Sequence, residues 1–576
     1  MNGSTLLIIT VVYFTAAYFI YGRFLRRLFG IDPSRKTPAV VKNDGVDYAP
    51  ARPAVLFGHH FASIAGAGPI LGPIFAAELG WIPALLWIFL GCVFIGGLHD
   101  FAALFLSVRH EGKSISSVIE ELVGYAGRMI FSVFCWAALA LVVAMFGIMT
   151  AQIFVNTPSA ATASVIFILL APVFGLVLNR RILGLLPASL IFVPLTFLSV
   201  WVGMLLPADL VGLFEIEPAT AQGIWLAVLG AYVFIASVAP VQWLLQPRDY
   251  LNSFLLYALL ICGLLGILVC NPDIVQQGWH GLKVITPSGA EKSVIPTLFI
   301  VIACGACSGF HSLVASGTTS KQVASEDHIQ LVGYGGMLLE GVLAVISLIS
   351  VLYLSGADFT SAVAKPQLAF ASGLAHFSTS LGLPEEAMGS FVSLVLAAFM
   401  MTTLDTATRL GRFVWQEILS GRQASPAVSS DKAVPEAGSS AVRKSSPLAA
   451  FLRNPYVATF IMVGMAATLC VSGQAGAIWP VFGASNQLLA ALCLLGVTLY
   501  LLKQRRGSLV AFIPMSFMIV MSCWGLGEMT AKGQFGILQI ISASLLALTL
   551  FLVILAIRAV IRTHQENRPK LSGTGN

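Results

Sequence analysis

Ionisable side chains occur inside several long apolar stretches of this sequence, where each costs several kcal/mol and is therefore a candidate functional group. Two stretches carry adjacent pairs, His59–His60 and His99–Asp100, and a third carries His311. Because imidazole titrates near physiological pH, we predict that His59, His60, His99, Asp100 and His311 couple proton movement to the protein's function. For His99 and Asp100, a plain interfacial position is an equal alternative to a proton relay.

The histidine pair is followed at once by glycines and prolines that disfavour a continuous helix. Such a break exposes backbone N–H groups suited to a carboxylate and carbonyl groups suited to a cation, provided that the break lines an enclosed cavity. A tight packing kink is the alternative. We predict that this break binds substrate through Gly66, Gly68, Pro69 and Ile70.

A second break is predicted near Pro240, where a backbone donor is missing beside the amide of Gln242. The two breaks would lie five helices apart, an odd number that inverts the second copy in the membrane. This arrangement is typical of five-plus-five inverted-repeat transporters, with substrate held between the broken helices. We therefore assign Gln242 to the substrate pocket and Pro240 to gating.

A hydroxyl-rich face accompanies His311, since Ser308 and Ser312 fall on its side of a helix. We predict that Ser308 and Ser312 complete the substrate pocket. A sodium site is the alternative use of the same region, with the candidate ligands Ser312, Ser316, Thr318 and Thr319.

An internal echo, Gly58-x-His60-x5-Gly66 and Gly309-x-His311-x5-Gly317, spans helices seven apart and would suit a seven-plus-seven repeat. Chance similarity is the preferred explanation, because the match holds at only three positions. Near the end of a later stretch, Asp405 is placed to pair with Arg409 at i,i+4, as a gate or as an ordinary helix end.

Enzymatic and metal chemistry find little support. Ser308 and His311 lie three apart on one helix and cannot easily align with a scissile bond. The pair Cys304-x-x-Cys307 stands alone in an apolar stretch, and the sequence contains no phosphate-binding P-loop. We expect no metal, no organic cofactor and no enzymatic activity, with an ion gradient as the energy source.

The elements that position these residues are membrane spans. Hydrophobic residues make up 57% of the 576 residues and charged residues only 10%, which excludes a soluble fold of this length. The basic residues sit at segment ends rather than in a patch, so nucleic-acid binding is not expected. Scanning for about 20 apolar residues per span predicts an all-α polytopic protein with about fifteen spans, near 6–21, 55–79, 81–106, 127–153, 160–179, 183–205, 223–245, 250–270, 295–317, 329–355, 387–403, 455–473, 477–501, 508–527 and 537–560.

Orientation follows from the loop charges. With the N-terminus outside and the C-terminus inside, fifteen spans place 28 Lys and Arg residues on the inner face and four on the outer face. One cytoplasmic segment, 420–450, is rich in Ser, Ala and Pro and is predicted to be a disordered linker.

Five motifs carry a resemblance to a known family. They extend in order over roughly residues 30 to 562, and together they resemble the carbon starvation protein A family. The motifs are Phe57–Pro73, Leu245–Ser253, Ser308–Thr319, Leu404–Arg412 and Phe482–Ala491, the last of which contains Asn486.

The resemblance implies a multi-pass importer of the bacterial inner membrane, active in nutrient starvation and related to the amino acid–polyamine–organocation transporters. It implies proton symport of pyruvate, of a similar small carboxylate or of short peptides; a sodium-coupled peptide transporter and a nutrient sensor with little transport remain alternatives. It also implies a long front domain and a five-helix C-terminal domain, which here correspond to a transporter core (31–386) and a C-terminal domain (387–562). The linker 420–450 interrupts the C-terminal domain and departs from the family pattern. The charges around the first and last spans predict an anchor helix (1–30) and a cytoplasmic tail (563–576), and Asn486 is assigned a gating or structural role. The oligomeric state is not predicted.

Overall fold

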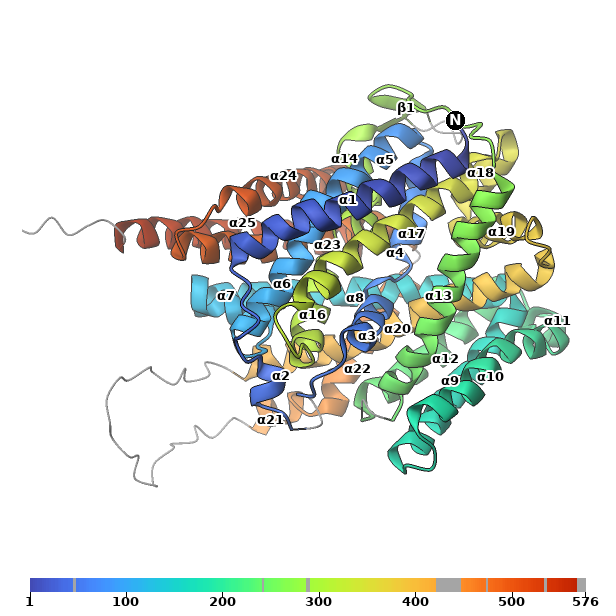
Figure 1. Ribbon diagram of the computed structural model, residues 1–576, viewed down its shortest axis with the longest axis horizontal. Coiled ribbons are helices and arrows are strands. Elements are labelled where there is room, and N and C mark those ends of the chain that lie inside the picture. Colours follow the sequence, from blue (N-terminus) through green and yellow to red (C-terminus); the bar gives the residue numbers. More distant parts are fainter. Residues whose placement is uncertain are drawn as a thin grey trace, which may run out of the picture.

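The structure is a computed structural model that describes residues 1–44, 48–240, 243–285, 291–420, 447–472, 475–532 and 536–566. Gln242, most of the predicted linker 420–450 and most of the tail 563–576 lie outside these ranges. Figure 1 shows a bundle of helices crossing one another at varied angles, with the first and last helices along its outside.

The N-terminal part contains the first predicted break. Helix α3 begins with Pro53, whose fixed φ suits a first helical position, and ends at Ile64; α4 then begins at Gly68. Preceding them, α1 ends at Phe29 and is capped by Gly30, whose φ of 68° favours glycine. The elements of this part are α1 (Gly3–Phe29), α2 (Pro38–Val41), α3 (Pro53–Ile64), α4 (Gly68–Ala77), α5 (Trp81–Leu90), the π-helical η1 (Gly91–Gly96) and α6 (Gly97–Arg109).

In the next part of the chain, from α7 to α13, the predicted second break is wrong. Pro240 does not interrupt a span, because α12 ends at Val238 and α13 begins only at Leu245. Pro240 therefore lies in the connection between two complete helices. The elements are α7 (Ile115–Val123), α8 (Tyr125–Asn156), α9 (Pro158–Asn179), α10 (Leu185–Leu205), α11 (Leu210–Phe214), α12 (Pro218–Val238) and α13 (Leu245–Cys270).

The second discontinuous span lies instead in the ninth predicted span, where Cys307 is extended (φ −165°, ψ 125°) between two short helices. A two-stranded antiparallel hairpin, with Val284 opposite Lys292, precedes it. The elements are β1 (Lys283–Ile285), β2 (Glu291–Ser293), α14 (Val294–Val301), α15 (Ala303–Ala306), α16 (Phe310–Gly317), the 3-10 turn η2 (Thr319–Lys321), the π-helical η3 (Gln330–Tyr334) and α17 (Gly335–Leu352).

The remaining helices pack directly on the earlier ones. Helix α20 lies along α8, and α23 contacts both α15 and α16. The predicted division into a core and a C-terminal domain stays a prediction. The elements are α18 (Gly356–Ala364), α19 (Pro366–Thr379), α20 (Glu385–Leu419), α21 (Pro447–Leu452), α22 (Pro455–Val471), α23 (Ala475–Lys503), α24 (Leu509–Lys532) and α25 (Ile537–Glu566).

The helices have the lengths and burial of a membrane protein. Among the described residues, 12 helical segments are long and apolar enough to cross a bilayer, and the bent pair α3–α4 raises this to 13. In α17 and α23, 89% of the most apolar window is buried, against 28% in α1 and α25, so the last two present apolar side chains outward. Each of the fifteen predicted spans overlaps one or more of the helices, while the total and the orientation stay predictions.

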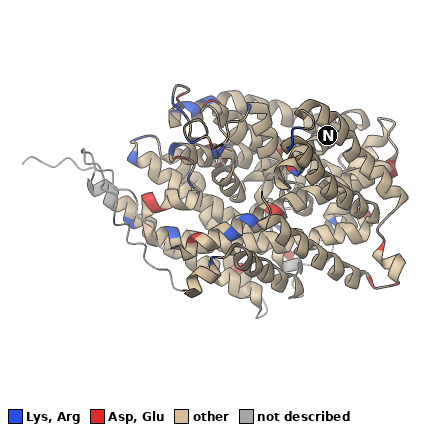
Figure 2. Cartoon of the chain, turned by 90° about the horizontal axis from the view of Figure 1, so that it is seen from below, with Lys and Arg blue, Asp and Glu red and all other residues tan. Residues whose placement is uncertain are grey.

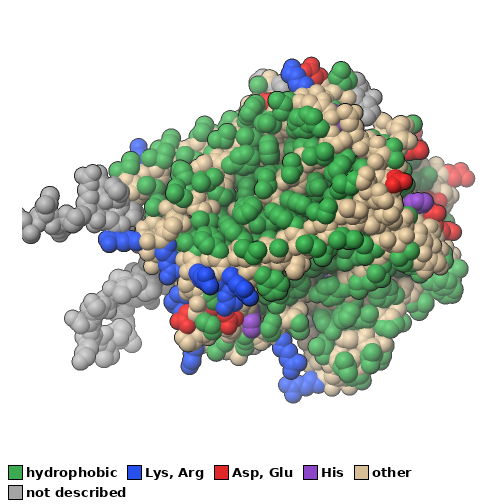
Figure 3. All heavy atoms as spheres, turned by 45° about the horizontal axis from the view of Figure 1, so that its top comes forward, with side chains coloured by type: hydrophobic (Ala, Val, Ile, Leu, Met, Phe, Trp, Pro, Cys, Tyr) green, Lys and Arg blue, Asp and Glu red, His purple; other side chains and the backbone are tan. Residues whose placement is uncertain are grey.

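The distribution of charge agrees with a bilayer environment. Charged side chains are sparse along the chain (Figure 2). A broad band of hydrophobic side chains crosses the face shown in Figure 3, and most of the visible Lys and Arg gather along its lower edge. Apolar side chains therefore face outward over much of the surface. Their exposure is unfavourable in water and favourable in the hydrocarbon core of a bilayer.

Candidate functional site

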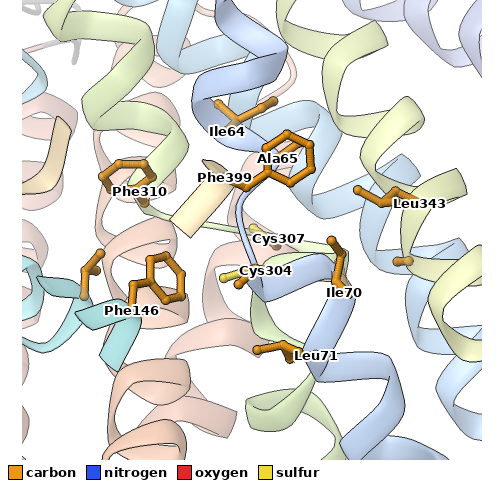
Figure 4. Close-up of a cluster of buried hydrophobic side chains, with 14 of the residues drawn as sticks. Ile64, Ala65, Ile70, Leu71, Phe146, Cys304, Cys307, Phe310, Leu343 and Phe399 are labelled. Atoms are coloured by element: carbon orange, nitrogen blue, oxygen red, sulfur yellow. The ribbon is translucent and has the colours of Figure 1, made fainter. Parts of the chain in front are cut away.

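The two discontinuous helices meet at their breaks. Helices α3 and α4 are bent by 48° around Gly66, and α4 packs on α15. The contact is close, because a Cβ added to Gly68 would lie 2.3 Å from Cys304 Cβ. Figure 4 shows Cys304 beside the start of α4, with Phe146 and Phe310 on the same side of the break. The two segments of the internal echo lie in and just beyond α3 and in and just before α16, and chance similarity stays the preferred explanation.

Asn486 of α23 braces the second break. Its Oδ1 accepts a hydrogen bond from the backbone N–H of Phe310 at 2.9 Å, and its backbone carbonyl accepts one from Gly309 at 3.1 Å. Its Nδ2 donates to Ser308 Oγ and to Cys304 Sγ, both at 3.0 Å. The amide therefore caps the start of α16 and ties both sides of the break to α23.

The first break has no comparable brace. Within the described structure, the backbone N–H groups of Ala67 and Gly68 make no hydrogen bond, whereas Ile70 and Leu71 donate to the Ala67 carbonyl. These free donors stand at the N-terminus of α4, where the helix dipole favours an anion.

A small cavity separates the two breaks. Its volume is about 20 Å³, enough for about one water molecule. The predicted residues Gly66, Gly68, Pro69 and Ser308 line it, together with Asn486. Ile64, Val142 and Cys304 also line its wall, as do three aromatic rings and one threonine that were not predicted from the sequence: Phe146, Phe310, Phe482 and Thr403.

Two predicted pocket residues lie outside this wall. The carbonyl of Ile70 accepts a hydrogen bond from Ser347, and the hydroxyl of Ser312 donates to the Gly309 carbonyl at 2.7 Å. Both residues are fully buried. Gln242 lies outside the described residues.

Next to the cavity, four buried ionisable groups form a chain that we call the imidazole–carboxylate cluster: His99, Asp100, His311 and Glu340. The Nδ1 atoms of His99 and His311 each lie 2.7 Å from a different oxygen of Asp100. The Nε2 of His311 lies 3.3 Å from Glu340 Oε2. All four side chains are at most 1% exposed. Sequence reasoning missed Glu340, although it is the only acidic residue in 329–355.

The other predicted histidines diverge. His60 is buried, with its Nδ1 2.9 Å from Thr319 Oγ1 and its Nε2 without a partner in the described structure. His59 is partly exposed, and its Nδ1 lies 3.9 Å from Asp249 Oδ2. The side chain of His60 therefore lies inside the protein, whereas that of the adjacent His59 faces a cavity.

The alternative sodium ligands do not converge on one point. The hydroxyls of Ser316 and Thr318 donate to carbonyls one turn earlier in α16. Ser312 bonds to the Gly309 carbonyl and Thr319 lies beside His60, so the four oxygens are spread over about 10 Å of chain.

A larger cavity of about 400 Å³, which we call the vestibule, opens toward the predicted cytoplasmic side. It is lined by His59 and Ser63 of α3, Asp249 of α13, Ser316 of α16 and Arg409 of α20. Another cavity, of about 410 Å³, extends from His59 between α3, α9 and α13. The vestibule and the small cavity approach each other along α3, because Ser63 lines the first and Ile64 the second.

The predicted pair of Asp405 with Arg409 is wrong. Asp405 instead forms a fully buried ion pair with Arg248 of α13 and accepts a hydrogen bond from Tyr232 at 2.8 Å. Arg409 donates to the carbonyls of Ala236 and Ala239, each at 2.6 Å. Asp405 thus joins α20 to α13, while Arg409 caps the C-terminus of α12.

Comparison with known proteins shows which transporters this chain is similar to in sequence. The curated peptide transporter CstA of Campylobacter jejuni is 31% identical over 583 residues, covering 91% of this chain and 80% of the relative. The pyruvate/proton symporter BtsT of Escherichia coli is 29% identical over 609 residues, covering 92% and 81%. These relatives are transporters and not enzymes.

A likeness in fold extends further. The crystal structure of a manganese transporter from Eremococcus coleocola matches with a TM-score of 0.51 at 12% identity, over 89% of this chain and 95% of that chain. This likeness concerns the fold alone and confirms the predicted fold class, an all-α multi-pass membrane protein with discontinuous helices.

The model of the family described as carbon starvation protein CstA matches residues 2–367 and 357–525, which is most of the sequence. The chain is therefore a member of the carbon starvation protein CstA family.

Proposed function

We propose that this protein is a secondary active importer of the bacterial inner membrane that moves a small carboxylate, such as pyruvate, or a short peptide inward with protons. The observation that carries the proposal is the closed cavity between two helix breaks, directly beside the imidazole–carboxylate cluster. Its relatives are named for peptide transport and for pyruvate/proton symport, and the family name associates it with carbon starvation.

The first break supports carboxylate binding. The unpaired N–H groups of Ala67 and Gly68 offer two donors at a helix N-terminus, and Ser308 and Thr403 offer hydroxyls nearby. Aromatic rings around them suit the apolar end of a small substrate. No charged side chain among the described residues lines the cavity, so backbone donors have to hold the anion.

The sizes of the small cavity and the vestibule support a transport cycle in which the substrate site opens and closes. A cavity of about 20 Å³ is too small for pyruvate, so the structure corresponds to a closed site beside a vestibule of about 400 Å³. Movement of Ile64 and Phe310, which both line the small cavity, would join the two spaces, because Ile64 directly follows Ser63 of the vestibule (Figure 4). A rocking motion of one set of helices against the other provides such a movement in transporters with repeats.

Buried imidazoles next to the cavity favour protons over sodium as the coupling ion. The four candidate sodium ligands are spread along the chain, which disfavours a single cation site.

Uptake into proteoliposomes tests the proposal. Labelled pyruvate and a labelled dipeptide are supplied separately, with either an imposed pH gradient or an imposed sodium gradient as the driving force. We expect proton-driven accumulation of one of the substrates, abolished by a protonophore. Sodium-driven accumulation would overturn proton coupling, and absence of both uptake and counterflow would favour a sensor.

Variants locate the coupling site. His60→Ala and His311→Ala are each expected to change the pH dependence of uptake, because both imidazoles are buried near the cavity. His376→Ala, which replaces an exposed histidine of α19, is the matched control. If both buried variants retain wild-type uptake at every pH, the proton assignment is wrong.

A further inference from the structure

Glu340 is a buried carboxylate in an unusual position. It lies within α17, is 0% exposed, and neither of its oxygens makes a hydrogen bond with the described residues. Its nearest polar partner is His311 Nε2, 3.3 Å from Oε2. A buried charge usually requires a cation or several donors, so this carboxylate needs an explanation beyond packing.

The geometry of the cluster leaves room for one particular proton. Both Nδ1 atoms face Asp100, which as a carboxylate only accepts hydrogen bonds, so each Nδ1 carries a hydrogen. The Nε2 of His311 then carries no hydrogen, so its lone pair faces a lone pair of the Glu340 carboxylate. One proton placed between His311 Nε2 and Glu340 Oε2 turns this repulsion into a charge-assisted hydrogen bond.

From this geometry we propose that Glu340 and His311 together hold the transported proton, and that His60 connects this site to the vestibule. The proposal rests on the proposed proton-coupled import and names the site that performs the coupling. Without the proton, two carboxylates and two neutral imidazoles give the cluster a net charge of −2, and with it −1. Binding the proton therefore halves a charge that is costly to bury.

The neighbours of Glu340 offer no alternative counter-charge. The titratable groups that interact with Glu340 are Asp100 of α6 and His311 of α16, together with the thiols of Cys92 on η1 and Cys304 on α15. His99 of α6 and His60 of α3 interact with Asp100 rather than with Glu340 itself. Helix α4 contains no ionisable residue. Among the described residues, no Lys or Arg takes part, so only a proton neutralises Glu340.

His60 supplies the connection. A Cβ added to Gly336 would lie 3.9 Å from His60 Nε2, and Gly336 precedes Glu340 by one helical turn, about 6 Å along α17. His60 therefore lies against α17 one turn before Glu340, and its Nε2 has no hydrogen-bond partner among the described residues. On its other side, His60 adjoins His59, which lines the vestibule.

Occupancy of the site can affect substrate through two contacts. His311 follows Phe310, which lines the small cavity, so a change in its bonding acts on the cavity wall. Helix α17 also reaches the other break, because Ser347 donates to the Ile70 carbonyl of α4. Proton and substrate thus bind to elements shared by both sites, as coupling requires.

The test uses Glu340→Gln in full-length protein in proteoliposomes, with the substrate that wild-type protein accumulates. The amide is neutral and donates a hydrogen bond to His311, so it imitates the proton-bound state. Counterflow exchange without a gradient should persist within about threefold of wild type, and proton-driven accumulation should fall by at least about tenfold. The pH dependence of exchange should also disappear.

Glu326→Gln is the matched control. Glu326 is likewise a buried carboxylate, but its partner is Arg109, at 2.7 Å, outside the cluster. This variant should retain proton-driven accumulation and pH-dependent exchange. The comparison separates loss of a buried charge in general from loss of the proton site.

Two outcomes overturn the proposal: Glu340→Gln still accumulates substrate against its gradient, or its exchange keeps the wild-type pH dependence. If Glu340→Gln yields no monodisperse protein, His60→Gln decides, because its proton-driven uptake should slow by at least about tenfold with exchange preserved. Uptake by His60→Gln at the wild-type rate would then overturn it. Failure of the wild type to transport at all would instead defeat the proposed function.

Discussion

The two helix breaks at the centre of this protein are built in different ways. The break between α15 and α16 is held by Asn486, which bonds to Ser308, Gly309, Phe310 and Cys304. The break between α3 and α4 has no side chain bonded across it among the described residues, and its N–H groups at Ala67 and Gly68 stay unpaired. One N-terminus is therefore already satisfied by the protein, and the other is available to a ligand.

This difference divides the work between the two broken helices. The braced helix α16 positions His311 against Asp100 and Glu340, where a small displacement would break a chain of short polar contacts. The unbraced helix α4 offers the N–H groups at its start to a substrate, and the hydrogen bond from Ser347 to its Ile70 carbonyl links its movement to α17. We infer that α16 holds the proton site in place while α3 and α4 respond to substrate.

The largest expected effect comes from filling the braced break. A Cβ at Gly309 would lie 2.4 Å from the Asn486 carbonyl oxygen and 2.5 Å from the Ala490 nitrogen, both backbone atoms of α23. Because neither can rotate away, Gly309→Ala should displace α23 and prevent folding. The measurement is the yield of monodisperse protein, with Gly464→Ala, which meets no atom within 4 Å, as the control. A normal yield would show that this break is more tolerant than its contacts indicate.

Filling the unbraced break should impair transport rather than folding. In Gly68→Ala, the new Cβ would lie 2.3 Å from Cys304 Cβ, so α4 has to move away from α15. We expect uptake to fall by at least about tenfold, a cost of about 1.4 kcal/mol, with monodisperse protein retained.

A second substitution separates a local clash from a general loss. Cys304→Gly removes the opposing Cβ, so the double variant Gly68→Ala/Cys304→Gly should recover a large part of the uptake. Absence of recovery in a folded double variant would mean that Gly68 is required for another reason, such as access of the substrate to its backbone N–H.

Removing the brace itself should have an intermediate effect. Asn486→Ala leaves the N–H of Phe310 buried without an acceptor, at a cost of about 1–3 kcal/mol of stability. Asn486→Asp retains that acceptor but loses the donor to Ser308 and buries a carboxylate without a cation, so its thermal unfolding temperature should also lie below that of wild type. Equal unfolding temperatures for all three proteins would contradict the bracing role.

Sequence alone located the unbraced break better than the braced one. The dense Gly66-Ala-Gly68-Pro69 run predicts its own interruption, because these residue types fail in a helix whatever surrounds them. The second break has no proline, and it persists because Asn486, 178 residues from Ser308, satisfies its backbone. The break predicted at Pro240 is wrong because proline also occurs at ordinary connections, where one complete helix ends before the next begins.

Pairings between distant helices were equally beyond local reasoning. His99, Asp100 and His311 could be predicted as titratable residues, but their convergence with Glu340 depends on three helices meeting. The pattern predicts Asp405 near Arg409 because i,i+4 neighbours are adjacent on a helix. A buried guanidinium from Arg248 takes that carboxylate instead. A lone acidic residue in an apolar stretch was the available signal for Glu340.

The smallest expected effect comes from Gly66, the other glycine at the unbraced break between α3 and α4. A Cβ at Gly66 would lie 2.9 Å from Thr403 Oγ1, the end of a side chain that can rotate at the loss of its hydrogen bond to the Phe399 carbonyl. Gly66→Ala should therefore fold normally and reduce uptake only about two- to fivefold, within the roughly 0.5–1 kcal/mol of one net hydrogen bond. Adding Thr403→Ala removes the conflict and should restore uptake, unless the Thr403 hydroxyl itself binds substrate. In that case the double variant would show a higher KM than Gly66→Ala alone, which would place Thr403 among the groups that hold the substrate.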